Sequence, residues 1–293
     1  MKKSLYLIVF LLSVTFVQAQ LVWKITGKEL KHPSYLFGTH HLIPLSFLDS
    51  VPGLYKAFNQ CDLVVGEMVM NNIDATAKIQ KAAMLPEHIK ISDLLSDSDY
   101  VMVEKELKSV LKFGLKEVSM MNPALIQTIY EMEIYKKQIG YSDDSQSDSY
   151  FQMVATEKGK QVIGLETIEE QIEVLFGDKN YERQASLLIE TVRNKDSVLL
   201  EMKHINNLYK QGNLNQLIEL SKKRGNTMDM TDEEYDRLID KRNVKWTTKL
   251  PTYLEQSSCF IAVGALHLGG KNGLIQLLEN EGYKEKPLTD KEK

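Results

Sequence analysis

Short, mainly apolar runs that are followed by glycine and then by a histidine or a glutamate occur near both ends of this 293-residue chain. Runs of this kind, bounded by polar segments, are typical of strands that are buried on both faces of a parallel sheet. Because the runs come from both ends of the chain, we predict one α/β domain with a small, mainly parallel sheet. They occupy residues 34–37, 63–65, 161–163 and 260–263.

The long middle of the chain has helical patterning instead. Asn122-Pro123 is typical of a helix start, with a capping side chain and a proline in the first turn. Thr231 and Glu234 have the spacing of a capping box. We therefore predict a large helical insertion at roughly residues 70–160, within a single domain that covers residues 20–293.

Residues 1–19 have the three parts of a secretory signal peptide. Lys2 and Lys3 precede an apolar stretch, and Val17-Gln18-Ala19 resembles the small-residue pattern at which such peptides are cleaved. The apolar stretch is short for a membrane span, so an uncleaved anchor is the less favoured alternative. We predict an exported protein that is periplasmic or extracellular after cleavage, with no membrane span in the mature chain.

The charge balance excludes one class of partner. The chain has 40 acidic and 36 basic residues and a formal net charge of −4. Proteins that bind nucleic acid usually carry an excess of positive charge on one face. We therefore expect no nucleic-acid partner.

The two cysteines could form a disulfide if the protein is exported, because oxidising compartments allow disulfides to persist. Cys61 and Cys259 each lie shortly before an apolar run, so their sulfurs could meet near the starts of neighbouring strands. Two separate buried thiols are the alternative, since sequence alone does not determine the distance between the Cα atoms.

Polar side chains with catalytic or metal-binding chemistry follow the predicted strands. The carboxyl ends of parallel strands share one edge of a sheet, and α/β proteins bind ligands at that edge. A glycine within the three preceding residues would allow a sharp turn beside each side chain. The candidates are His41 after Gly38, Glu67 after Gly66, Glu166 after Gly164 and His267 after Gly264.

Two histidines and a glutamate at one edge suit two kinds of chemistry. They could hold a divalent metal ion, which would lower the pKa of its bound water to about 7. Alternatively, one neutral histidine could act as a general base without a metal. Taken singly, each signal is also compatible with a histidine bonded within its loop or, at Glu166, with an acidic first helical turn. His40 adjoins His41, and neighbouring side chains of an extended segment point to opposite faces, so we favour His41 as the residue facing the site.

The order of these motifs resembles the TraB/GumN family over nearly all of the mature chain. That family includes the Tiki metalloproteases, which cleave exported or membrane-tethered proteins with a divalent metal, and it is related to the erythromycin esterase-like hydrolases. Gly66 stands where the family pattern has an apolar residue. The matching segments are residues 21–67, residues 164–167 with Gln171, Arg242-Asn243, and residues 263–270 with Gly273-Leu274, Leu277-Leu278 and Gly282-Tyr283.

The resemblance implies a role for each matching residue. His41, Glu67 and His267 would hold a divalent ion, with manganese, cobalt and zinc all compatible with nitrogen and oxygen ligands. Arg242 would stabilise developing negative charge, although a surface ion pair with Asp236 is the simpler explanation of this helical arginine. The supporting residues would be Gly38, Thr39, Gly264, Glu166 and Asn243.

Two hypotheses for the function follow. The first is an exported, metal-dependent hydrolase that resembles a protease and acts on a protein or peptide. The second is a non-catalytic protein that binds a metal or a ligand on the same scaffold. The two hypotheses share the site and differ in whether a substrate is turned over.

Overall fold

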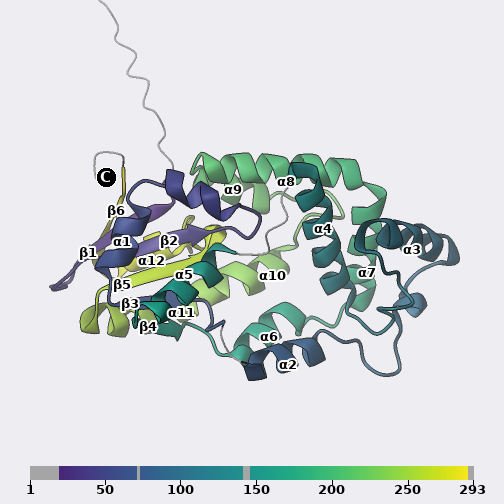
Figure 1. Ribbon diagram of the computed structural model, residues 1–293, viewed down its shortest axis with the longest axis horizontal. Helices are drawn as coiled ribbons and strands as arrows, with labels where there is room; N and C mark the ends of the chain where they lie inside the picture. The colour runs from purple at the N-terminus through teal and green to yellow at the C-terminus, as the bar shows by residue number, and fades with distance from the viewer. Residues whose placement is uncertain (1–19, 71–72, 141–145, 290–293) are drawn as a thin grey trace, which may run out of the picture.

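The computed structural model describes residues 20–70, 73–140 and 146–289, so the predicted signal peptide lies outside the described residues. Six strands form one sheet in the order β4-β3-β5-β2-β1-β6 (Figure 1). The four strands from β4 to β2 pair in parallel, whereas β1 pairs antiparallel with both β2 and β6. The predicted fold class, a mainly parallel sheet built from both chain ends, is confirmed. The strands are β1 (Val22–Gly27), β2 (Ser34–Thr39), β3 (Leu63–Gly66), β4 (Gln161–Gly164), β5 (Cys259–Gly264) and β6 (Tyr283–Pro287).

Helices cover the sheet and extend well beyond it (Figure 1). Asn122 caps α4 with Pro123 in the first turn, and Thr231 and Glu234 form the capping box that the sequence predicts. The α-helices are α1 (Leu54–Gln60), α2 (Ile73–Ala82), α3 (Asp97–Leu111), α4 (Pro123–Ile139), α5 (Ser147–Glu157), α6 (Ile168–Phe176), α7 (Tyr181–Arg193), α8 (Lys195–Lys210), α9 (Leu214–Ser221), α10 (Asp232–Tyr235), α11 (Lys241–Gln256) and α12 (Leu274–Asn280). Shorter turns are η1 (Leu45–Ser50), η2 (Ile91–Leu94), the π-helical η3 (Asp236–Asp240) and η4 (Ala265–His267).

Strand β6 differs from the sequence prediction, which ends the sheet at residue 263. Its sequence, Tyr-Lys-Glu-Lys-Pro, has one buried aromatic side chain among charged ones and lacks the apolar run of the inner strands. Charged residues and proline are common on edge strands, where they discourage pairing with other chains. A strand of this kind has too few apolar residues for a pattern of hydrophobicity to reveal it.

The apolar side chains form two separate cores. One core surrounds the sheet and includes residues of α1, α5, α9, α11 and α12; we call this part the sheet lobe. The other core lies among α3, α4 and α7 and contains no strand; we call this part the helical lobe. The helical lobe is the part at the right of Figure 1. Each lobe therefore buries an apolar interior of its own.

Helix α8 joins the two lobes. Its first half contributes Val198 to the core of the helical lobe, and its last turns contribute Leu208 and Tyr209 to the core of the sheet lobe. Figure 1 shows α8 running along one side of the molecule from one lobe to the other. A continuous helix with one apolar patch in each core links the lobes through its own backbone hydrogen bonds.

Cys61 and Cys259 are both free and buried, the alternative that the sequence left open. Burial raises the pKa of each thiol to about 12, and for Cys61 the nearby Cys259 contributes to the increase. Thiols with such a high pKa are unreactive near neutral pH, because the thiolate is the nucleophile.

Within residues 20–70, 73–140 and 146–289, no helix is both long enough and apolar enough to cross a membrane.

Candidate functional site

The sheet brings three of the predicted residues to one edge. Glu67 follows β3 and Glu166 lies two residues after β4, while His267 ends η4, the turn that follows β5. Strand β3 pairs in parallel with both β4 and β5, so the three chain segments leave the sheet side by side. The shared carboxyl edge of a parallel sheet therefore explains why residues so distant in sequence meet.

Arg242 on α11 binds all three of these side chains. Its Nε and Nη2 donate to the two carboxylate oxygens of Glu166, each at 2.9 Å, and Nη2 also donates to Glu67 Oε2 at 2.6 Å. Its Nη1 lies 3.1 Å from His267 Nε2. The residue is 7% exposed, and Asp236 pairs with Lys241 instead. The prediction of a surface ion pair between Arg242 and Asp236 is therefore wrong. Arg242 lies at the centre of a buried cluster instead.

Glu67 is held ionised within this cluster. Burial by itself would raise the pKa of its carboxyl, but His267, Arg242 and the backbone N–H of Gly264 together lower it to about 2. The Gly264 N–H donates to Oε1 at 2.9 Å. A Cβ at position 264 would lie 3.4 Å from the same oxygen, an ordinary van der Waals contact.

His267 is neutral, and its tautomer follows from Asn243. The Asn243 amide nitrogen donates to the carbonyls of His267 and Asn272, which leaves its Oδ1 facing the ring Nδ1 at 2.7 Å. Nδ1 therefore carries the proton, and Nε2 keeps its lone pair toward Arg242. Burial lowers the pKa of the imidazole to about 4, with Glu67 opposing the change and Arg242 adding to it.

Trp246 completes the cluster and is not among the residues predicted from the sequence. Its indole N–H donates to Glu166 Oε1 at 3.0 Å, and its ring lies 4.7 Å from the guanidinium carbon of Arg242 and 4.4 Å from the His267 ring. The spacing of four residues from Arg242 puts both side chains on one face of α11, which was the available signal. Gln171, part of the family pattern, accepts from Arg242 Nη2 at 3.2 Å.

The model of the TraB/PrgY/gumN family matches residues 21–287. The chain belongs to this family. No curated protein and no solved structure matches the sequence. The family match covers both the sheet lobe and the helical lobe.

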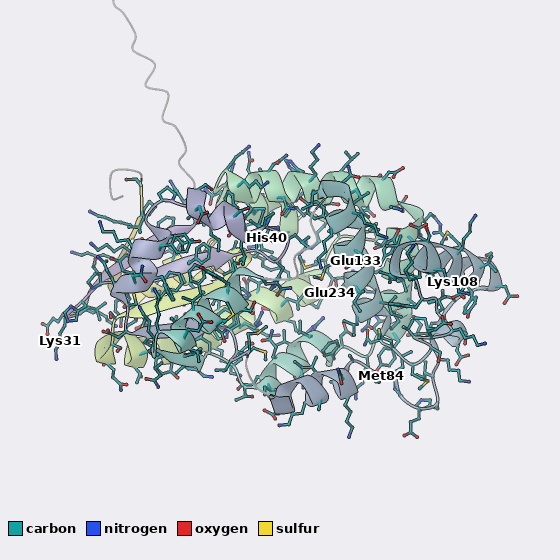
Figure 2. All side chains as sticks on the ribbon, in the orientation of Figure 1. Lys31, His40, Met84, Lys108, Glu133 and Glu234 are labelled. Atoms are coloured by element: carbon teal, nitrogen blue, oxygen red, sulfur yellow. The ribbon has the colours of Figure 1, made fainter. Side chains whose placement is uncertain are left out.

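The first histidine motif of this family member lies partly away from the cluster. His41 is exposed, and its Nδ1 lies 3.0 Å from Gln146 Oε1 at the start of α5. His40, labelled in Figure 2, is the inward residue: its ring packs 5.1 Å from that of Tyr209, and burial lowers its pKa to about 4. Neighbouring side chains do take opposite faces, but His40 is the one that enters the interior.

Gly38 and Thr39 support the site through packing. A Cβ at Gly38 would lie 3.1 Å from Ala265 Cα, so glycine lets η4 approach the end of β2 closely. Thr39 is buried and stands opposite Gly264 in the parallel register. These contacts hold the turn that carries His267.

The metal ion that the family resemblance implies does not fit the donors as they are arranged. His267 Nε2 and Glu67 Oε1 lie 3.8 Å apart, but Arg242 bonds both residues and directs Nη1 at the lone pair that a metal would need. His41, the third predicted ligand, contacts Gln146. In the described part of the chain, no group of three or more His, Cys, Asp and Glu side chains is placed to hold a metal ion.

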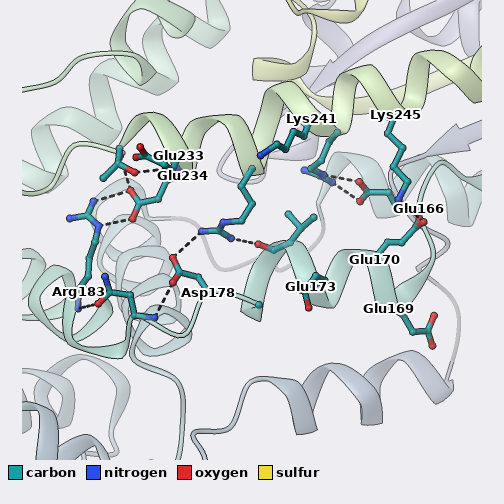
Figure 3. Close-up of a pocket in the computed structure, with 16 residues that line it drawn as sticks. Glu166, Glu169, Glu170, Glu173, Asp178, Arg183, Glu233, Glu234, Lys241 and Lys245 are labelled. Atoms are coloured by element: carbon teal, nitrogen blue, oxygen red, sulfur yellow. Dashed lines mark hydrogen bonds and ion pairs between the residues drawn. The ribbon is translucent and has the colours of Figure 1, made fainter.

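A pocket of about 970 Å³ begins at Glu166 and Arg242 and continues between α6 and the α10–α11 segment (Figure 3). Its walls are unusually rich in charge, with glutamates along α6 facing arginines and lysines of the opposite segment. Several of these charges pair within the lining. The pairs are Arg183–Glu234, Arg237–Asp178 and Lys245–Glu170.

Proposed function

We propose that this TraB/PrgY/gumN family member is a hydrolase that activates water at the cluster of Glu67, His267 and Arg242. The observation that supports this most directly is the combination of charge states in one buried contact. A neutral imidazole whose lone pair faces Arg242, an ionised carboxylate and a permanent cation meet in this contact, and Arg242 also lines a pocket. Strongly shifted pKa values beside a pocket are typical of catalytic sites.

In this proposal His267 is the general base. A water molecule transfers a proton to Nε2 while its oxygen bonds to the carbonyl carbon of the substrate. Asn243 keeps the proton on Nδ1, so that Nε2 is the atom available to accept. The imidazolium that forms would face Glu67 Oε1, 3.8 Å away, and this carboxylate would stabilise it. The proton then passes to the leaving amine as the bond from carbon to nitrogen breaks.

Arg242 would stabilise the negative charge on the carbonyl oxygen. Its Nη1 would turn from His267 Nε2 to this oxygen, which frees the lone pair at the same moment that charge develops. Because the guanidinium is planar and rigid, its two bonds to Glu166 would shift with this turn. Removing a single donor of this kind from an enzyme typically lowers kcat by about 100- to 1,000-fold.

The pocket supports a polypeptide as the substrate. Its volume of about 970 Å³ suits several residues of an extended chain, and its charged walls suit polar side chains and peptide groups. An apolar ester would leave these charges without compensation on burial. We therefore propose a protein or peptide substrate.

A metal-dependent form of this hydrolase would need a different arrangement of the cluster. Arg242 Nη1 would have to leave His267 Nε2, and His41 would have to leave Gln146. Treatment with a chelator separates the two forms, because a histidine base keeps its activity and a manganese, cobalt or zinc enzyme loses it. Elemental analysis of the purified protein provides an independent measurement.

Peptide-library cleavage by His267→Ala and Arg242→Lys tests the hydrolase proposal. We expect each substitution to lower kcat at least about 100-fold, because each removes one chemical role. Lys195→Ala, at an exposed pair in the helical lobe, is the control and should cleave like the original chain. Equal cleavage by all four proteins would contradict the proposal.

One observation favours the non-catalytic alternative. Every nitrogen of the Arg242 side chain already bonds to the protein, so the cluster is closed without a ligand. A binding protein on this scaffold would retain a peptide in the pocket without cleaving it. Binding of a labelled library peptide that is recovered intact after long incubation would identify this case.

We also propose that the protein is exported, on the basis of the signal-peptide pattern in residues 1–19. Sequencing the N-terminus of the protein after expression with its leader tests this. A mature N-terminus at Gln20 in the periplasmic or extracellular fraction is expected. An intact leader in the cytoplasmic fraction would contradict the proposal.

A further inference from the structure

A buried glutamine on α5 binds the backbone that follows Glu67. Gln152 is 4% exposed, its Nε2 donates to the Met68 carbonyl at 2.9 Å, and its Oε1 accepts from the Met70 N–H at 3.0 Å. The side-chain amide thus makes both hydrogen bonds that a neighbouring strand would make to this segment. A buried amide bonded at both ends is held in one orientation.

Gly66 provides the space that this amide occupies. A Cβ at position 66 would lie 2.4 Å from Gln152 Nε2, closer than two non-bonded atoms can approach. The atom in the way is the end of a flexible side chain, so alanine at this position would displace the amide and leave the strand in place. The glycine that departs from the family pattern therefore has a local partner.

The amide continues the support that the sheet provides to Glu67. On the sheet side, the Glu166 N–H donates to the Glu67 carbonyl at 2.8 Å, and the Leu165 N–H donates to that of Gly66 at 2.9 Å. Beyond Glu67 the chain leaves the sheet, and Gln152 forms hydrogen bonds with the backbone of Met68 and Met70. Glu67 consequently stands between two anchored stretches of backbone.

We propose that Gln152 is a positioning residue for Glu67 and that Gly66 is its required partner. This inference depends on the proposed hydrolase only in the experiments that measure catalytic activity. Without the amide, the backbone of residues 68–70 is free to shift, and the Glu67 carboxylate moves relative to His267 and Arg242. Small displacements of catalytic groups are sufficient to reduce turnover strongly.

A double-mutant cycle tests the pairing. Gln152→Ala removes the amide and Gly66→Ala displaces it, so both variants lose the same two hydrogen bonds. We expect each to lower kcat on the order of tenfold with little change in KM, and the double variant to lower it no further. Effects that multiply in the double variant would overturn the pairing of Gly66 with Gln152.

Gln152→Glu distinguishes positioning from simple filling of space. A protonated carboxyl group donates and accepts like the amide, whereas a carboxylate only accepts. The ratio of the variant's kcat to that of the original chain should therefore rise as pH falls. A ratio that does not change with pH would mean that the side chain acts through its volume alone.

Amide hydrogen exchange gives a readout that does not depend on catalysis. In Gln152→Ala the Met70 N–H should exchange on the order of tenfold faster, because it loses its only acceptor among the described residues. Gln127→Ala is a matched control, since it removes one glutamine hydrogen bond, to Glu131, from the helical lobe. Unchanged Met70 exchange in Gln152→Ala would overturn the inference even if the hydrolase proposal stands. Faster exchange in a protein without activity would uphold the positioning contact and count against the hydrolase alone.

Discussion

The sheet lobe and the helical lobe each bury an apolar interior, but they differ in where their ion pairs lie. The sheet lobe encloses Arg242 with Glu166 and Glu67 beside its core. Two ion pairs of the helical lobe, Lys195–Glu106 and Arg193–Asp99, have side chains that are all at least one quarter exposed. Burying charge costs free energy that surface pairs avoid, so proteins usually retain it where it serves a purpose. We therefore expect the proposed chemistry in the sheet lobe and a supporting role for the helical lobe.

Among these variants, Arg242→Met should have the largest effect on the free energy of unfolding. It leaves two carboxylates in a buried site without their cation, which typically costs about 3–5 kcal/mol of unfolding free energy. Urea denaturation followed by circular dichroism measures this loss. A loss below about 1 kcal/mol would mean that the cluster behaves like the surface pairs of the other lobe.

Leu107→Ala probes the helical lobe by itself. Leu107 is fully buried in the core of that lobe, and truncation of such a leucine costs about 2–5 kcal/mol. We expect amides of α3 and α4 to exchange faster, while peptide cleavage per folded molecule stays unchanged. A comparable loss of kcat would show that the two lobes are not separable in function.

Acid should weaken the sheet lobe before the helical lobe. Burial lowers the pKa of His40 and His267 to about 4, below the value of 6.5 for the unfolded chain. The unfolded state therefore binds more protons in this range, and stability is lost as pH falls from about 6.5 toward 4. We expect the free energy of unfolding to fall by about 1 kcal/mol per histidine between pH 6.5 and 5.5.

Urea denaturation at a series of pH values measures this dependence, and His40→Phe should remove about half of it. Hydrogen exchange at pH 5.5 should show faster exchange in β2 and β5, because His40 follows β2 and His267 lies in the turn after β5. A uniform loss in both lobes would contradict the assignment to the sheet lobe.

Lys195→Ala should have the smallest effect. Its pair with Glu106 has side chains that are 38% and 26% exposed, and exposed ion pairs typically contribute less than about 1 kcal/mol. Thermal denaturation at low and high salt is the measurement. A larger loss of stability that does not depend on salt would mean that ion pairs contribute alike in the two lobes.

Much of the fold could be predicted from the sequence, because its signals are local. The four runs became the inner strands, and the caps at Asn122 and Thr231 start helices where expected. Strand β6 could not be predicted, since its pairing with β1 depends on backbone contacts and not on an apolar pattern. Local periodicity shows which segments bury a face, but an edge strand buries little.

The candidate site could be predicted only in part. Glu67, Glu166 and His267 meet because strand ends share an edge, which the order of the strands implies. The burial of Arg242 was not predictable from α11, where charged neighbours suggested a surface residue. Its partners Glu166 and Glu67 lie 76 and 175 positions away in the sequence. Contacts across such separations leave no local pattern.

The sequence by itself determined the α/β class, the position of each polar residue after its strand and the family to which the chain belongs. The tertiary structure alone decided that His40 points inward, that Asn243 sets the tautomer of His267 and that Gln152 occupies the space left by Gly66. The physical reason is the separation in sequence between the residues that interact. Strands and caps depend on neighbouring residues, whereas charge states and orientations depend on side chains that only packing brings together.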